Sequence, residues 1–171
     1  MFDNIKVIAA DIDGTLAKTA VNPSAYTLDT IRDLQDAGYL FGLASGRPAD
    51  DVVNKYKVWG AARQFDFIIG WNGCELIDLH ENKKYQYNKL KKEWIKEIID
   101  FMAEFNANIH MYLPGVYIAS SDTDNDNEML RISNGVCLKD GNENTKKLAK
   151  YVTEEGCEDD GFAKFIHRYV L

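Results

Sequence analysis

Short apolar runs alternate with amphipathic segments along most of the chain, and this alternation restricts the fold more than any other feature of the sequence. The run KVIAA at residues 6–10 is almost continuously apolar, as in a strand that is buried on both faces of a sheet. Residues 27–38 then place apolar side chains at helical spacing, with Thr27 as the expected N-cap and Gly38 as the stop. The alternation indicates an α/β fold with a parallel central sheet covered by helices.

The rest of the chain continues this pattern, with one interruption in the middle. Residues 75–87 alternate apolar and polar side chains around the turn sequence HENK and predict a β-hairpin. A strongly amphipathic helix is expected at about 92–105. The other expected elements are strands at 39–44, 65–70, 108–112, 116–120 and 135–138 and helices at 47–56, 127–133, 144–150 and 161–170. A length of 171 residues suits one domain with a core of its own.

Charge and composition exclude several classes of partner. The formal net charge is −7, whereas proteins that bind nucleic acid or anionic membranes concentrate lysine and arginine on one face. No apolar run approaches the length that spans a bilayer, and the first residues contain no signal-peptide core. The three cysteines are odd in number and lack a CxxC spacing, which favours a reducing compartment. We therefore expect a cytoplasmic protein with neither nucleic acid nor membrane as a partner.

Polar residues follow four of the expected strands at the point where each strand ends. These residues are Asp11, Ser45, Asn72 and Asp122. In open α/β sheets, ligands bind in the crevice outside the carboxyl ends of the strands. The four side chains are therefore expected to converge on one binding site.

Two groups of carboxylates stand at this edge of the expected sheet and indicate a divalent cation. Asp11 and Asp13 point the same way from an extended strand, and two carboxylates about 4 Å apart repel by roughly 4 kcal/mol at an effective dielectric near 20. Either one acid is protonated, as a general acid would be, or a cation lies between them. With Asp122 and Asp126 added, the oxygen-only ligand set favours Mg²⁺ that is shared with a phosphate group.

Each carboxylate group also has a simpler interpretation. The segment DIDGTL is compatible with an ordinary strand-to-turn junction, and the segment SDTDND with a solvated turn. A calcium loop starting at Asp122 is a third alternative, but Asn127 stands where such a loop needs glycine and Ser133 where it needs glutamate. Both groups end strands of one expected sheet, which favours a shared metal site over these alternatives.

Four motifs, taken in order, resemble the signature of a known protein family. They are DIDGTL at residues 11–16, ASGR at 44–47, NG at 72–73 and SDTDNDNEML at 121–130. As a set they resemble the haloacid dehalogenase (HAD) superfamily, and most of all its Cof-type phosphatase branch, subfamily IIB. The C-terminal segment from residue 134 onward is similar to that branch as well. The resemblance covers most of 5–75 and 121–170 and implies a three-layer Rossmann-like core.

The resemblance also implies a role for individual residues in the hydrolysis of a small phosphorylated metabolite. Asp11 would be the nucleophile that forms an aspartyl-phosphate, and Asp13 would be the general acid that later acts as the base for water. The phosphate-binding and substrate-binding set would be Ser45, Gly46, Arg47, Asn72 and Asn125. The ligands of Mg²⁺ would be Asp11, Asp13, Asp122 and Asp126.

The chain departs from the family pattern at two positions in the motifs. Ser121 stands where the last motif usually begins with glycine. The family also places a lysine beside the phosphorylated aspartate, and no lysine of this chain has the usual KG context. Lys92 is the expected substitute, with Lys91 as the second choice.

The resemblance further implies that most of the family's α/β cap is missing. Residues 1–74 and 113–171 are expected to form the catalytic core, and residues 75–112 a truncated cap-like insertion. A site left open in this way implies a homo-oligomer that shields it.

Three functions stay open on the sequence alone. The first is a Mg²⁺-dependent phosphatase that works through an aspartyl-phosphate. The second is a catalytically impaired HAD-like protein that binds metal or phosphate, which the missing lysine and the shortened cap favour. The third is an interaction module whose acidic cluster binds Ca²⁺.

Overall fold

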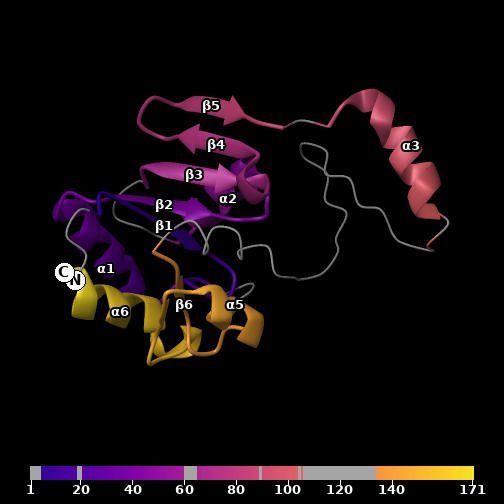
Figure 1. Cartoon of the computed structure of the whole chain (residues 1–171). Helices are drawn as coiled ribbons and strands as arrows, with labels where there is room; N and C mark the ends of the chain where they lie inside the picture. Colours follow the sequence, from indigo (N-terminus) through magenta and orange to yellow (C-terminus); the bar gives the residue numbers. More distant parts are fainter. Residues whose placement is uncertain (1–4, 19–20, 60–64, 89, 104, 106–133) are drawn as a thin grey trace.

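A five-stranded mixed sheet forms the centre of the computed structural model, which describes residues 5–18, 21–59, 65–88, 90–103, 105 and 134–171. The strands, in their order across the sheet, are β1 (Val7–Asp11), β2 (Leu40–Ala44), β3 (Phe67–Gly70), β4 (Glu75–Asp78) and β5 (Lys83–Gln86). The first three strands run parallel, and the hairpin β4–β5 lies antiparallel beside β3 (Figure 1). The expected α/β fold and the expected hairpin are both confirmed.

Two helices connect the parallel strands and pack on the sheet. Helix α1 (Ala25–Asp36) lies between β1 and β2 in the chain, and α2 (Ala49–Lys57) lies between β2 and β3. A single-turn 3₁₀ helix, η1 (Trp71–Gly73), follows β3. The most deeply buried side chains come from these helices and from the strands that they cover, and include Ile31, Leu34, Phe41, Leu43, Val52 and Ile68. Their removal from water is the main force that holds the helices on the sheet.

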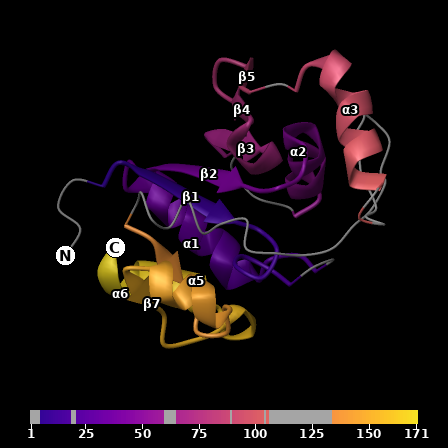
Figure 2. The same cartoon turned by 45° about the vertical axis from the view of Figure 1, so that its right-hand side comes forward.

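The C-terminal segment packs at the β1 end of the sheet, away from the hairpin (Figure 2). It consists of β6 (Val136–Cys137), α5 (Glu143–Leu148), β7 (Tyr151–Val152), the 3₁₀ helix η2 (Cys157–Asp159) and α6 (Gly161–Tyr169). Helix α6 lies along α1, where the imidazole Nε2 of His167 is 3.1 Å from the hydroxyl of Thr30. The His167 ring also stacks on Tyr26, with the ring centroids 5.5 Å apart. These contacts join the two ends of the described chain into one core.

Helix α1 and strand β1 differ from the sequence-based expectation. Helix α1 begins three residues earlier than expected, because the side chain of Ser24 is its N-cap and accepts a hydrogen bond from the backbone N–H of Thr27 at 3.0 Å. Strand β1 is at one edge of the sheet formed by the described strands, and Val7 is 53% exposed there. Within the described part of the chain, β1 is therefore not the doubly buried strand that its continuous apolar run predicts.

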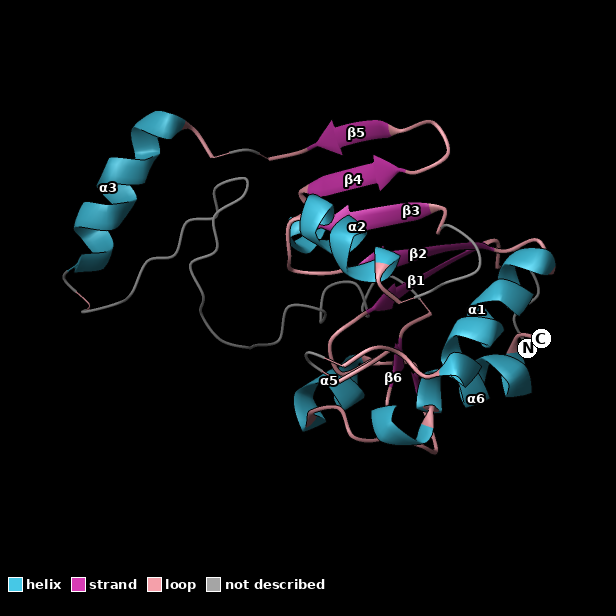
Figure 3. Ribbon diagram, turned by 180° about the vertical axis from the view of Figure 1, so that it is seen from behind, coloured by secondary structure: helices cyan, strands magenta, loops and turns pink. Residues whose placement is uncertain are grey.

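Helix α3 (Lys92–Ala103) confirms the amphipathic helix expected after the hairpin, and it stands apart from the sheet (Figures 1 and 3). Its large apolar side chains are only partly covered, and Trp94 and Phe101 are 48% and 60% exposed. None of the described helices has the length and apolar character needed to cross a membrane.

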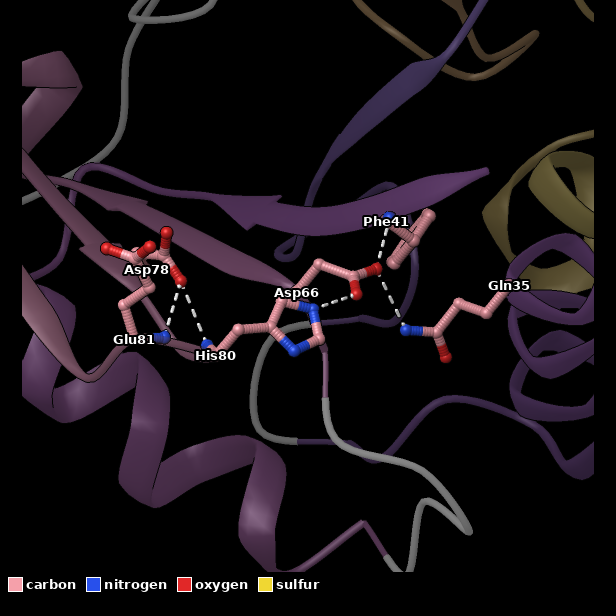
Figure 4. A network of polar contacts seen from close by, with 6 residues as sticks. All are labelled: Gln35, Phe41, Asp66, Asp78, His80 and Glu81. Atoms are coloured by element: carbon pink, nitrogen blue, oxygen red, sulfur yellow. Dashed lines mark hydrogen bonds and ion pairs between the residues drawn. The ribbon is translucent and has the colours of Figure 1, made fainter. Parts of the chain in front are cut away.

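A buried carboxylate fastens the end of the sheet from which β3 begins (Figure 4). Asp66 directly precedes β3, and one of its oxygens accepts hydrogen bonds from the backbone N–H of Phe41 at 2.7 Å and from the amide of Gln35 at 3.0 Å. Its other oxygen is 2.5 Å from Nε2 of His80 in the hairpin turn. Asp78 shapes that turn by accepting from the backbone N–H groups of His80 and Glu81. Asp66 thus links α1, β2 and the hairpin. It does so at the end of the sheet opposite to the strand ends that carry Asp11 and Ser45.

Candidate active site

The carboxyl ends of the three parallel strands lie side by side and bring several of the expected site residues to one end of the sheet. Asp11 is the last residue of β1 and pairs with Ala44, the last residue of β2. Ala44 in turn pairs with Ile69 near the end of β3. Ser45 follows β2 directly, so its position is fixed beside Asp11 by strand register alone.

Backbone hydrogen bonds fasten the loops after β2 and β3 to each other. The N–H of Ser45 donates to the carbonyl of Ile69 at 2.9 Å, and the N–H of Asn72 donates to the carbonyl of Ser45 at 3.3 Å. The N–H of Trp71 donates to the carbonyl of Arg47 at 2.9 Å. Trp71 and Asn72 both have a positive φ, 53° and 50°, which asparagine tolerates but which strains a bulky residue. The two loops that carry the expected site residues Ser45, Arg47 and Asn72 are therefore joined by backbone hydrogen bonds.

Glycine allows a sharp turn directly after Asp13. Gly14 has a φ of 92°, which side chains with a Cβ seldom adopt, and its N–H donates to the carbonyl of Ala17 at 2.7 Å. The carbonyl of Ile12 accepts from Leu16 and Ala17 in the same turn. This turn reverses the chain and leaves Asp13 at the strand ends.

Two cations hold the carboxylate of Asp13. Arg47 donates to Oδ2 through Nε at 3.0 Å and lies 2.9 Å away through Nη2, while the ammonium of Lys55 is 2.9 Å from Oδ1. Ser45 holds the backbone of Arg47, because its hydroxyl oxygen accepts a hydrogen bond from the backbone N–H of Arg47 at 3.2 Å. Partial burial raises the pKa of Asp13, but the hydrogen bonds and charges of Lys55 and Arg47 outweigh burial and hold that pKa below its usual value. Asp13 is therefore a carboxylate at neutral pH in this arrangement.

Lys55 is a member of the site that the sequence analysis did not single out. It lies on α2, forty-two residues from Asp13 in the chain, and its side chain is 21% exposed. The available signal was its place on the helix, since Val52 and Tyr56, three residues before it and one after, are both buried. A lysine beside a buried stripe keeps its stem covered and must find a partner for its charge.

A second buried carboxylate holds the start of α2, the helix that carries Lys55. Glu75 is 3% exposed, and its Oε2 accepts from the N–H of Ala49 in the first turn of α2 at 3.0 Å. Its Oε1 accepts from Gln86 at 3.0 Å and pairs with Lys84 at 2.8 Å. Burial raises the pKa of Glu75, and these partners lower it to a net value below the ordinary one. The hairpin β4–β5 thus holds the start of α2, the helix that carries Lys55 to Asp13.

The approach of α2 to β3 depends on a glycine. A Cβ added to Gly70 would lie 2.5 Å from the backbone nitrogen of Ala49, which is far inside the normal contact distance. Gly70 therefore lets the first turn of α2 reach the end of β3. Arg47 lies two residues before Ala49, just ahead of the helix.

Several expected site residues lie where the structure gives no test of them. Asp122, Asn125 and Asp126 are outside the described residues, as is the core boundary at residue 113. Lys92 begins α3, which stands apart from the strand ends (Figures 1 and 2), and its role stays a prediction. In the described ranges alone, no group of three or more histidine, cysteine, aspartate or glutamate side chains could hold a metal ion.

Comparison with known proteins identifies the family. The family model of haloacid dehalogenase-like hydrolases matches residues 8–122 and 116–166. Together these two ranges cover most of the chain. The chain belongs to this family. Within it, the chain groups with the Cof-type phosphatases of subclass IIB.

Curated relatives share part of the sequence. A Buchnera aphidicola protein (subspecies Schizaphis graminum), provisionally named a phosphatase, is 35% identical over 75 residues, which are 44% of this chain and 26% of the relative. A Bacillus subtilis protein, 5-amino-6-(5-phospho-D-ribitylamino)uracil phosphatase YitU, is 27% identical over 103 residues, which are 60% of this chain and 37% of the relative. The chain thus spans well under half the length of these relatives.

Solved structures share the fold. A haloacid dehalogenase-like hydrolase from Bacteroides thetaiotaomicron superposes with a TM-score of 0.73 at 17% identity, over 96% of this chain and 99% of that one. A subclass IIB sugar phosphatase of the HAD superfamily superposes with a TM-score of 0.72 at 16% identity, over 96% and 98% of the two chains. At these identities the likeness concerns the fold, and it confirms the HAD-like α/β core.

Proposed function

We propose that this chain hydrolyses the phosphoric monoester of a small metabolite through an aspartyl-phosphate on Asp11, with Mg²⁺ as cofactor. The observation that carries the proposal is the grouping of Asp11, Asp13, Ser45 and Arg47 at the carboxyl ends of β1 and β2. Family membership and the relatives named as phosphatases support the same reaction class. An anionic nucleophile and an anionic ester need nearby positive charge, and this edge of the sheet supplies it from the chain itself.

Asp11 and Asp13 divide the chemistry between them in this proposal. A carboxylate oxygen of Asp11 attacks phosphorus, and the bond from phosphorus to the leaving oxygen breaks. Asp13 acts in its protonated form, which it reaches by taking a proton from solvent once one of its two cations has moved away, and it gives that proton to the leaving oxygen. Asp13 then takes a proton from water, whose oxygen attacks the phosphorus of the aspartyl-phosphate. Phosphate leaves and the carboxylate of Asp11 is restored. The hydroxyl of Ser45 and the amide of Asn72 are the proposed hydrogen-bond donors to the phosphoryl oxygens.

The donor set suits a hard divalent cation. Asp11 offers carboxylate oxygens at the end of β1, Asp13 could add an oxygen once Arg47 or Lys55 releases it, and Asp122 and Asp126 are the proposed further ligands. When bound there, Mg²⁺ would neutralise part of the charge on the phosphoryl group and on the nucleophile. The residues of the chain would still supply the nucleophile, the proton and the phosphate-binding donors.

We retain the division into a core of residues 1–74 and 113–171 and a reduced cap of residues 75–112 as part of the proposal. The hairpin β4–β5 and helix α3 would be this cap, and a homo-oligomer would shield the site. A catalytically impaired relative is the second candidate. It is favoured by one observation, namely that both carboxylate oxygens of Asp13 are held by cations in the described structure.

Hydrolysis of p-nitrophenyl phosphate by the purified protein tests the proposal. We expect magnesium-dependent turnover that EDTA abolishes and that Asp11→Asn removes without loss of folding. Asp29→Asn is the matched control, because Asp29 lies on the exposed side of α1, where its ion pair among the described residues is a local one with Arg32. Turnover that survives EDTA or Asp11→Asn would contradict the mechanism, and a folded wild type without turnover would favour the impaired relative.

A further inference from the structure

We propose that Lys55 is a phosphate-binding cation of this site, which rests on Asp13 when no substrate is bound and moves to the phosphoryl group when substrate binds. The inference deepens the proposed function, because it assigns a substrate-binding residue from α2. It rests on that function for the identity of the substrate, and on the described side chains for everything else.

The geometry of α2 directs Lys55 toward the strand ends. Side chains on a helix lean toward its N-terminus, and the N-terminus of α2 follows the loop that carries Ser45 and Arg47. The long stem of Lys55 therefore returns its ammonium to the site, where it ends 2.9 Å from Oδ1 of Asp13. Lys57, two residues further along the same helix, is exposed, and no ion pair links it to the described residues.

Arg47 and Lys55 bring two positive charges to the strand ends. They pair with the carboxylate of Asp13, and the carboxylate of Asp11 lies at the end of β1 in the same place, so the two cations offset two carboxylates before any substrate binds. Lys55 is mostly covered and has limited access to water, which makes its remaining attraction for an anion stronger than on an open surface. A phosphoryl group that binds at the strand ends adds negative charge there, and Lys55 is the cation in position to pair with it.

The proposed reaction requires Asp13 to release a partner. Both of its oxygens are engaged, so neither can serve the leaving oxygen until one cation moves away. Lys55 is the one that can move, because its polar contact among the described residues is a single one, made through a flexible stem. Arg47 contacts Asp13 with two nitrogens, and its backbone is bonded to both Ser45 and Trp71. A phosphoryl oxygen offers Lys55 an anionic acceptor in exchange for Asp13.

Titration with inorganic phosphate, followed by ³¹P NMR in the presence of EDTA, tests the exchange without metal and without turnover. We expect Lys55→Met to weaken phosphate binding about tenfold, the loss typical of one charge-assisted contact. Lys55→Arg should keep most of the affinity, and Lys57→Met, the same change on the exposed side of α2, should leave it unchanged. Asp13→Asn should tighten phosphate binding several-fold, because it removes the competing partner.

The outcomes separate this inference from the proposed function. Equal phosphate affinity in Lys55→Met and wild type, an equal loss in Lys57→Met, or weaker binding in Asp13→Asn would each overturn the role of Lys55. Circular dichroism and melting temperatures confirm that each variant is folded before its affinity is compared. If the expected affinities are found in a protein that does not hydrolyse p-nitrophenyl phosphate, Lys55 stands and the phosphatase reaction falls. If hydrolysis is found without the expected affinities, the reverse holds.

Discussion

Replacing Asp66 tests how much one buried carboxylate contributes to the fold. Asp66→Ala removes the acceptor of the buried N–H of Phe41 and one hydrogen bond of the buried Gln35 amide. A buried donor that loses its acceptor costs about 1–3 kcal/mol, so the two together should lower the free energy of unfolding by roughly 2–6 kcal/mol. That is a large part of the stability of a domain of this size.

Two further variants identify the source of this loss. His80→Ala removes the third partner of Asp66, but the His80 side chain is 62% exposed, and an exposed pair contributes at most about 1 kcal/mol. Asp66→Asn keeps one oxygen for Phe41 and Gln35 but replaces the oxygen that faces His80 by an NH₂ group, so its effect should lie between the other two. Urea unfolding followed by circular dichroism measures all three. A loss below about 1 kcal/mol in Asp66→Ala, or an equal loss in His80→Ala, would refute the reasoning.

The pKa of Asp66 gives the same network a dependence on pH. Burial raises this pKa, but the hydrogen bonds from Gln35, Phe41 and His80 outweigh burial and hold it below its ordinary value. The unfolded chain therefore binds the proton more readily, and the contribution of the carboxylate is full above about pH 4 and is lost as the pH falls through the folded pKa. The difference in free energy of unfolding between wild type and Asp66→Asn should become smaller as the pH falls below about 4. A difference that grows there would contradict a lowered pKa of Asp66 in the folded protein.

Three other substitutions test the supports of the site and of α1. Glu75→Ala should cost about 2–4 kcal/mol in urea unfolding, because it removes the acceptor of the buried Ala49 N–H and leaves Lys84 without its buried partner, and a cost below 1 kcal/mol would contradict this. Gly70→Ala should cost roughly 1–3 kcal/mol and lower phosphatase activity, since its Cβ would push α2 off β3; unchanged stability and activity would show that α2 can shift freely. Ser24→Ala should lower the free energy of unfolding by about 1 kcal/mol, because it removes the N-cap of α1. An unchanged urea midpoint would show that the Ser24 side chain does not stabilise the start of this helix.

The order of the elements could be predicted from the sequence because hydrophobic periodicity is a local signal. The apolar runs at β1, β2 and β3 predicted strands, and the alternation around HENK predicted the hairpin. Parallel strand ends meet at one edge, so Asp11 and Ser45 could be expected together without any knowledge of side-chain contacts.

The parts that could not be predicted depend on contacts between distant positions. The ion pair of Lys55 with Asp13 spans forty-two residues, and nothing in the local pattern of α2 names its partner. The partners of Asp66 likewise come from α1, β2 and the hairpin turn. The exposure of Val7 depends on which strand lies beside β1, and a continuous apolar run does not record that.

Acid quenching of the enzyme during turnover of ³²P-labelled acetyl phosphate, followed by borohydride reduction and peptide sequencing, tests the nucleophile most directly. Reduction converts an aspartyl-phosphate to homoserine, so a covalent intermediate marks its own position in the chain. We expect homoserine at position 11 in wild type and none in Asp11→Asn. Turnover with homoserine at another position, or with no labelled protein at all, would contradict it.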